Sequence, residues 1–290
     1  MAQIISRARN KKACEIYKLL GGKSPILEET IAQATALEDV LDKNKYKVFV
    51  CMRHAKPNVD DLEQEIKQYN PDQIIAIPLY PQFSYTTTHS AVEQIKARFK
   101  NIKTKFIGCF YTSKQFIDTH VDLIKNALEE VNLSNCIVLF SAHSLPVKII
   151  QKGDPYESQV KETVAKIVEK LPVVEYKITY QSKVGPIKWL EPKTEDEILK
   201  ACLEKKEIVV VAISFVSEHS ETLVELDIEY KKIAQEQGIK YVRVQTCRTH
   251  PKFIQSLKSL IEISENNPQN ITSEAGKRLC NKDFKYCICK

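Results

Sequence analysis

The stretch that most constrains the fold is residues 208–230, which read IVVVAISFVSEHSETLVELDIEY. Residues 208–213 are all apolar and mostly β-branched, which is typical of a strand covered on both faces in a parallel sheet. A polar turn follows, and residues 221–230 then have helical spacing. A strand that runs into a helix in this way places its polar turn at the carboxyl edge of the sheet, where open α/β sheets bind ligands.

Three glutamates, Glu221, Glu225 and Glu229, recur at every fourth position of the predicted helix. Like charges at this spacing destabilise a helix by roughly 0.2–0.5 kcal/mol per pair. One interpretation is a solvated helix face whose first glutamate gains from the positive helix start. The other is a row of oxygen ligands or proton acceptors leading away from His219, suited to a divalent cation or a proton relay. The pattern alone leaves both open.

Strand patterns alternate with helical patterns along the whole chain, which predicts an α/β fold with mainly parallel sheets. The expected strands are residues 46–52, 73–79, 105–109, 136–141, 176–181, 208–213 and 240–245. They form two series that meet near Ser134. We therefore predict two domains, 1–134 and 135–265, followed by a cysteine-containing tail, 266–290.

Composition excludes several classes of protein. The 290 residues are 43% hydrophobic with only 7 Gly, which argues for a packed core. Net charge is +6, but basic runs with interleaved aromatics are missing, so we expect no nucleic-acid partner. Neither a GxGxxG nor a P-loop pattern occurs, which leaves a nucleotide cofactor unsupported. Without an apolar run of spanning length or a signal-peptide core, we expect a cytoplasmic protein, in peripheral contact with the inner membrane at most.

Four long stretches of the chain resemble the ferrochelatase family. They are PLYPQFSYTTTHS (78–90), LFSAHSLPVKIIQKGDPY (139–156), YQSKVGPIKWLEPKT (180–194) and SFVSEHSETLVELDIEY (214–230). The shorter GGKSPI and MRHAKP occur in the same order, and the match runs from about residue 6 to residue 263. The resemblance implies two Rossmann-like, chelatase-type domains, with parallel sheets flanked by helices and an active-site cleft between them. It also implies a lyase that inserts Fe²⁺ into protoporphyrin IX, the last step of haem biosynthesis.

The resemblance assigns roles to five residues near the reacting centre. His143 matches the family's acceptor for pyrrole protons or its metal contact, Glu221 faces it across the porphyrin, and His219 lies close by. Glu225 and Glu229 match an acidic helix along which protons or metal move. The chemistry agrees, because imidazole is a base with a pKa near neutrality. Imidazole with one or two carboxylates also holds Fe²⁺ loosely enough to hand it over.

Further positions match residues that line or support the porphyrin cleft. They are Tyr17, Ser24, Arg53, His54, Phe215 and Trp189. Each is equally plausible as a packing residue. We expect the remaining histidines, His89, His120 and His250, to have structural roles.

The resemblance has one gap, at the N-terminus. Family members carry a strand, a Gly-Gly-Pro turn and a helix ahead of the point that matches Ser6, and this sequence lacks them. We therefore expect an unpaired strand edge in the first sheet and weakened porphyrin binding. The alternatives are a truncated, non-catalytic porphyrin- or haem-binding protein, and a chelatase for coproporphyrin or another metal.

Nine cysteines in a cytoplasmic chain are expected to be thiols or metal ligands rather than disulfides. Cys280, Cys287 and Cys289 resemble the C-terminal cysteines of ferrochelatases that carry a [2Fe–2S] cluster. Such a cluster needs four protein ligands. The resemblance suggests Cys109 as the fourth, with Cys247 as second choice; the alternative is a tail with incidental thiols or adventitious zinc. By analogy with cluster-bearing members we also expect a homodimer.

Overall fold

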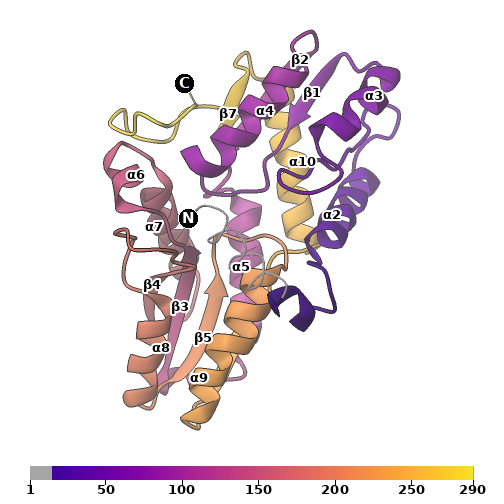
Figure 1. Cartoon of the computed structure of the whole chain (residues 1–290). Helices are drawn as coiled ribbons and strands as arrows, with labels where there is room; N and C mark the ends of the chain where they lie inside the picture. The colour runs from indigo at the N-terminus through magenta and orange to yellow at the C-terminus, as the bar shows by residue number, and fades with distance from the viewer. Residues whose placement is uncertain (1–14, 290) are drawn as a thin grey trace.

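The structure, a computed structural model, describes residues 15–289, so residues 1–14 of the first predicted domain and Lys290 lie outside it. It contains two parallel β-sheets with helices packed against them (Figure 1). This confirms the predicted α/β class with two chelatase-type sheets. Within the described residues, no helix is both long and apolar enough to cross a bilayer.

The C-terminal sheet has four strands in the order β4-β3-β5-β6. They are β3 (Cys136–His143), β4 (Glu175–Gln181), β5 (Glu207–Ala212) and β6 (Tyr241–Val244). Every neighbouring pair is parallel. His143 is therefore level with Gln181 at the carboxyl edge, two positions beyond the pairing of Ser141 with Ala212. The loops that follow β3, β4 and β5 leave the sheet at this one edge.

Helices cover both faces of the C-terminal sheet. They are α5 (Lys114–Leu128), α6 (Val147–Gln151), α7 (Tyr156–Val168), α8 (Thr194–Leu203), the π-helix η3 (Glu221–Tyr230) and α9 (Lys231–Glu236). Successive strand residues point to opposite faces. Leu139 and Val210 accordingly pack against α8, η3 and α9, while Val138 and Val209 belong to the core formed with α5 and α7. The apolar runs of the sequence are thus explained by burial on both sides.

The N-terminal sheet is smaller, with the order β1-β2-β7. Its strands are β1 (Gln73–Ala76), β2 (Lys103–Cys109) and β7 (Ile271–Ser273), and around it lie α2 (Ile26–Val40), α3 (Val59–Tyr69), the π-turn η1 (Tyr85–His89), α4 (Ser90–Arg98) and α10 (Pro251–Asn266). The 3₁₀ turn η2 (Leu133–Asn135) leads into β3, and Asn135 contacts the Lys205 carbonyl oxygen ahead of β5. The predicted division at residues 134 and 265 remains a prediction. The structure adds that β7, from the predicted tail, pairs with β2 of the first half.

The predicted strand at residues 46–52 is wrong. The segment is not assigned to a strand, and the neighbouring expected strand at 73–79 shortens to β1. A strand needs a partner for its backbone groups. Residues 46–53 and 73–80 both line one cavity, and β1 pairs only with β2. In the part of the chain described, β1 therefore has one unpaired edge, as expected from the sequence.

The helix at residues 221–230 was expected to have ordinary α spacing, and this is wrong. It is the π-helix η3, ten residues long, which continues into α9. Most π segments are single-turn bulges, often at functional sites, so one of this length is unusual. The wider turn changes which side chains share a face. Glu221 and Glu225 are partly buried, whereas Glu229 is exposed.

Candidate active site

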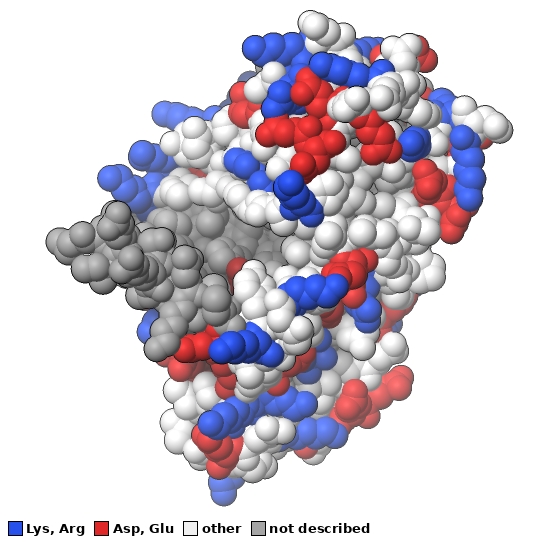
Figure 2. Space-filling model, turned by 45° about the vertical axis from the view of Figure 1, so that its right-hand side comes forward, with Lys and Arg blue, Asp and Glu red and all other residues white. Residues whose placement is uncertain are grey.

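A cavity of about 1250 Å³ lies between the two halves of the chain. The N-terminal half supplies part of α2 and the two extended stretches 46–53 and 73–80. The C-terminal half supplies residues at its carboxyl edge, which are His143, Leu145, Tyr156, Ser214, Phe215, Val216, Ser217, His219 and Glu221. Figure 2 shows a hollow in the surface, bordered by uncharged residues and with charged residues above and below it.

His143, the last residue of β3, faces Glu221, the first residue of η3. His143 Nδ1 and Glu221 Oε2 are 2.8 Å apart. Burial disfavours the charged form of both side chains. The hydrogen bond and mutual charge nevertheless outweigh it, raising the pKa of His143 and lowering the pKa of Glu221. Both shifts favour the imidazolium–carboxylate form of the pair.

His219 lies in the turn between β5 and η3 and has the opposite protonation preference. Burial lowers the pKa of His219, and the negative charge of Glu221 only partly offsets this. Its Nδ1 is 3.2 Å from the Ser217 carbonyl oxygen, so Nδ1–H donates and Nε2 keeps its lone pair. The Phe215 ring lies 4.6 Å from His219 and 6.3 Å from His143, measured between ring centroids. Two imidazoles whose pKa values are shifted in opposite directions thus flank the same aromatic ring.

Glu225 is held by the loop after β4 and by the end of its own helix. Its carboxylate accepts from Ser182 N (2.9 Å), Ser182 Oγ (2.5 Å), Gln181 Nε2 (3.2 Å) and Tyr230 OH (2.8 Å). Ser182 has a φ of 62°, in the left-handed region, which is uncommon for a residue other than glycine. The Glu225 carboxylate is therefore fully hydrogen-bonded. Of the five residues expected near the reacting centre, His143, Glu221 and His219 line the cavity, and Glu225 and Glu229 do not.

The six predicted porphyrin-side residues divide into two groups. Arg53, His54 and Phe215 line the cavity, whereas Tyr17, Ser24 and Trp189 do not. Trp189 forms an isolated bridge with Pro146 and so supports the loop that follows His143.

Sequence reasoning did not single out Tyr156, Ser214 or Ser182. The Tyr156 hydroxyl lies 2.9 Å from the His143 carbonyl oxygen and 2.8 Å from Ser214 Oγ, which ties the end of β3 to the loop after β5. All three residues lie in stretches that carried the family resemblance. Their residue types alone gave no signal, because Ser and Tyr are common in ordinary loops.

The four cysteines suggested as cluster ligands come together at the end of β2. Cys109 contacts Cys289, Cys289 contacts Cys287, and Cys287 contacts Cys280. A Cβ at Gly108 would lie 2.7 Å from Cys289 Sγ, so this approach requires glycine. Hydrogen bonds from the neighbouring thiols lower the pKa of Cys287.

The second choice of cysteine, Cys247, lies elsewhere. It is buried beside His120, with 3.6 Å between Cys247 Sγ and His120 Nε2. The four contacting thiols form a chain rather than a cage. Among residues 15–289, no group of three or more His, Cys, Asp or Glu side chains is arranged as a ready metal site.

Two solved structures have the same fold as this chain. One is SirB from Bacillus subtilis with Fe³⁺, with a TM-score of 0.54 and 15% identity over 84% of this chain and 94% of that one. The other is CbiX, the terminal enzyme for biosynthesis of sirohaem in denitrifying bacteria, with a TM-score of 0.55 and 12% identity over 83% of this chain and 93% of that one. At these identities the likeness supports the fold alone.

Sequence comparisons are far more specific. The ferrochelatase family model matches residues 1–265. A ferrochelatase of Rickettsia bellii is 47% identical over 298 aligned positions, covering 100% of this chain and 83% of that protein. A Wolbachia ferrochelatase is 49% identical over 270 positions, covering 90% of this chain and 85% of that protein. The cavity, its histidines and these matches together show that the chain belongs to the ferrochelatase family.

Proposed function

We propose that the cavity between the two halves is where this ferrochelatase inserts Fe²⁺ into protoporphyrin IX, completing haem biosynthesis. The observation that carries the proposal is the grouping of His143, His219 and Glu221 on one cavity wall, with His143 Nδ1 2.8 Å from Glu221 Oε2. The reaction removes two pyrrole protons and brings in a divalent cation. It therefore needs a free base and an anionic group at the same place, and His219 and Glu221 supply them.

The geometry supports a division of roles. His219 Nε2 carries a lone pair and is assigned as the acceptor of the first pyrrole proton. His143 already holds a proton against Glu221, so it becomes a base only after that proton leaves. We assign His143 and Glu221 together to the second proton and to contact with the incoming Fe²⁺. One imidazole and one carboxylate bind Fe²⁺ loosely enough for its transfer to the porphyrin.

We assign Glu225 and Glu229 to a route for protons along η3 and not to open metal sites. The carboxylate oxygens of Glu225 already accept hydrogen bonds from the loop after β4 and from Tyr230. Glu229 is exposed and lies eight positions beyond Glu221. Glu225→Gln should then slow turnover without weakening iron binding. A weakened apparent iron affinity with unchanged turnover would return Glu225 to the metal site.

Anaerobic metallation of protoporphyrin IX by Fe²⁺ tests the function. We expect turnover by the chain, with a loss of about 10²–10⁴-fold in His143→Ala. His250→Ala is the matched control, because His250 does not line the cavity. Parallel assays with coproporphyrin and with Zn²⁺ distinguish the related chelatases. Tight porphyrin binding by the wild-type chain, without metallation of any kind, would instead establish the non-catalytic binding protein.

We further propose that Cys109, Cys280, Cys287 and Cys289 hold a [2Fe–2S] cluster. The convergence of a strand-end cysteine with three tail cysteines supports this, and four cysteine thiolates are the usual ligands of such clusters. The bound cluster would supply a redox-active centre that joins the tail to β2. Iron–sulfur absorption should vanish in Cys109→Ser and survive in Cys247→Ser. The reverse pattern would refute the assignment.

Peripheral contact with the inner membrane, a cytoplasmic location and a homodimer are proposals of the same kind. They are supported by the net charge of +6 and by family analogy. Cosedimentation with vesicles of anionic phospholipid tests the membrane contact. Light scattering after gel filtration tests the dimer, and a monomer mass at micromolar concentration would contradict it.

A further inference from the structure

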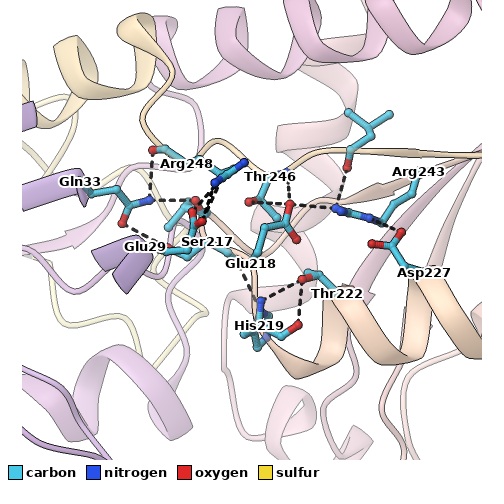
Figure 3. A network of polar contacts seen from close by, with 12 residues as sticks. Glu29, Gln33, Ser217, Glu218, His219, Thr222, Asp227, Arg243, Thr246 and Arg248 are labelled. Atoms are coloured by element: carbon cyan, nitrogen blue, oxygen red, sulfur yellow. Dashed lines mark hydrogen bonds and ion pairs between the residues drawn. The ribbon is translucent and has the colours of Figure 1, made fainter. Parts of the chain in front are cut away.

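Gln33 is a long polar side chain placed in the interior of the molecule. It lies in the middle of α2, in the N-terminal half, and is 2% exposed. A buried amide is costly unless both its ends find hydrogen-bond partners. The partners of Gln33 all belong to the other half of the chain (Figure 3).

The Gln33 amide is satisfied at both ends. Its Nε2 donates to the carbonyl oxygens of Val216 (2.9 Å) and Arg248 (3.1 Å), and its Oε1 accepts from Ser217 Oγ (3.1 Å). These three hydrogen bonds need a side chain with two N–H donors, one acceptor oxygen and the length of glutamine. Asparagine is too short, and a glutamate carboxylate cannot donate.

The segment that Gln33 grips, residues 214–220, carries Phe215 and His219 into the cavity. Residues 214–220 are also held by hydrogen bonds from their own, C-terminal half. The Glu218 carboxylate accepts from Thr246 N (3.0 Å) and from Arg243 Nη1 (3.0 Å), which itself is 10% exposed. In Figure 3 Glu218 lies between Thr246 and Arg243, and Gln33 reaches in from α2 on the other side. The loop is thus clamped between its own half and the neighbouring one.

α2 also forms part of the cavity wall, through Ile26, Thr30, Ala34 and Gln33 itself, although Gln33 is only 2% exposed. One helix therefore touches the substrate cavity and grips the loop that bears the neutral histidine. We propose that Gln33 is a positioning residue that fixes Phe215 and His219 against the macrocycle, an inference that rests on the proposed chemistry of this cavity. Misplacing a catalytic group by about 1 Å can cost two orders of magnitude in rate.

Gln33→Met tests the proposal, since methionine keeps the length and apolar volume but makes none of the three hydrogen bonds. We expect kcat for iron insertion to fall by about tenfold or more, with the porphyrin KM changed less than about threefold because the apolar walls remain. Asp39→Asn is the matched control. Asp39 lies on the same helix α2, pairs with Lys43 at an exposed position (63% and 66% exposed) and does not line the cavity, so its loss should leave kcat unchanged.

A second readout does not need turnover. The imidazole signals of His219, followed by NMR, should shift in Gln33→Met and stay in place in Asp39→Asn. Lower thermal stability with unchanged kcat and unchanged His219 signals would overturn the proposal and leave Gln33 a purely structural residue. If Gln33→Met does not fold, Ser217→Ala takes its place, because it removes only the hydrogen bond to Gln33 Oε1. It must then lower kcat and shift the His219 signals, both by less than expected for Gln33→Met. If the wild-type chain inserts no iron but the His219 signals still differ between Gln33→Met and the wild type, the proposed function is refuted and the positioning role of Gln33 stands.

Discussion

The two sheets of this molecule differ in size and in the burial of the strands that reach the cavity, and we call the four-stranded C-terminal sheet the complete sheet and the three-stranded N-terminal sheet the incomplete one. In the C-terminal sheet, β3 and β5 are paired on both sides and almost wholly buried. In the N-terminal sheet, β1 is paired on one side, and none of its four residues is fully buried. The complete sheet carries His143, Glu221 and His219, while the incomplete one supplies cavity wall. Groups that must be held to a fraction of an ångström come from the part with the densest packing, as preorganised sites require.

The largest expected effect is a difference in kinetics between variants on the two cavity walls. His219→Ala should lower kcat by about 10²–10⁴-fold, because it removes the neutral base from the complete sheet. His54→Ala, on the opposite wall, should chiefly raise the porphyrin KM. Steady-state kinetics of both variants measure the difference. Equal losses of kcat would mean that the chemistry is shared between the halves.

Stability should show the same contrast. Leu139 in β3 is 0% exposed, so Leu139→Ala should cost about 2–5 kcal/mol of unfolding free energy. Ile75 in β1 is only partly buried and borders the cavity, so Ile75→Ala should cost roughly 1 kcal/mol, since less apolar surface is lost. Urea denaturation monitored by circular dichroism gives both values. A cost for Ile75→Ala equal to that for Leu139→Ala would show that the first sheet is as well packed as the second.

Backbone protection should follow strand pairing. Amides of β3 and β5 should exchange with deuterium only on global unfolding, whereas those of residues 47–51, which lie outside any strand, should exchange through small local openings. Hydrogen exchange followed by mass spectrometry resolves the two regions. Slow exchange across residues 47–51 would indicate a backbone partner that pairs with this segment in solution.

The smallest effect concerns pH. The raised pKa of His143 adds stability below the unfolded value of 6.5, and this contribution is lost as pH rises through its folded pKa. The lowered pKa of His219 acts oppositely, because the unfolded chain binds more protons as pH falls below 6.5. The two contributions therefore have opposite signs in the wild type. Glu221→Gln removes the first, so its stability should fall more steeply between pH 7 and about 5; parallel curves for both proteins would contradict this.

The sequence predicted best where burial alone decides structure. The apolar runs at residues 136–141 and 208–213 identified β3 and β5 within two residues at each end. It failed where structure depends on a distant partner. Residues 46–52 have strand composition but no neighbouring strand, and β7 is three residues long, too short to give a periodic signal.

Prediction of the site from sequence had the same limit, because its contacts join residues that are far apart in the chain. That His143 and Glu221 share one site was expected from the family resemblance and not from spacing, since 78 residues separate them; the resemblance placed them on opposite sides of the porphyrin, whereas here they are in direct contact. The π geometry of η3 was hidden, because residues spaced by four suit an α-helix equally well. The engagement of Glu225 depends on the left-handed backbone of Ser182, which residue type does not reveal. The grip of Gln33 on Val216 likewise joins residues 183 positions apart.

The central claim is that the complete sheet presents one charged and one neutral imidazole to the cavity. An NMR titration of the His143 and His219 imidazoles in the free enzyme, assigned with His143→Ala and His219→Ala, tests it most directly. The account predicts that His143 titrates above 6.5 and His219 below it, with the His219 proton on Nδ1. Titration of both near 6.5, or in the reverse order, would contradict the assignment of His219 as the free base.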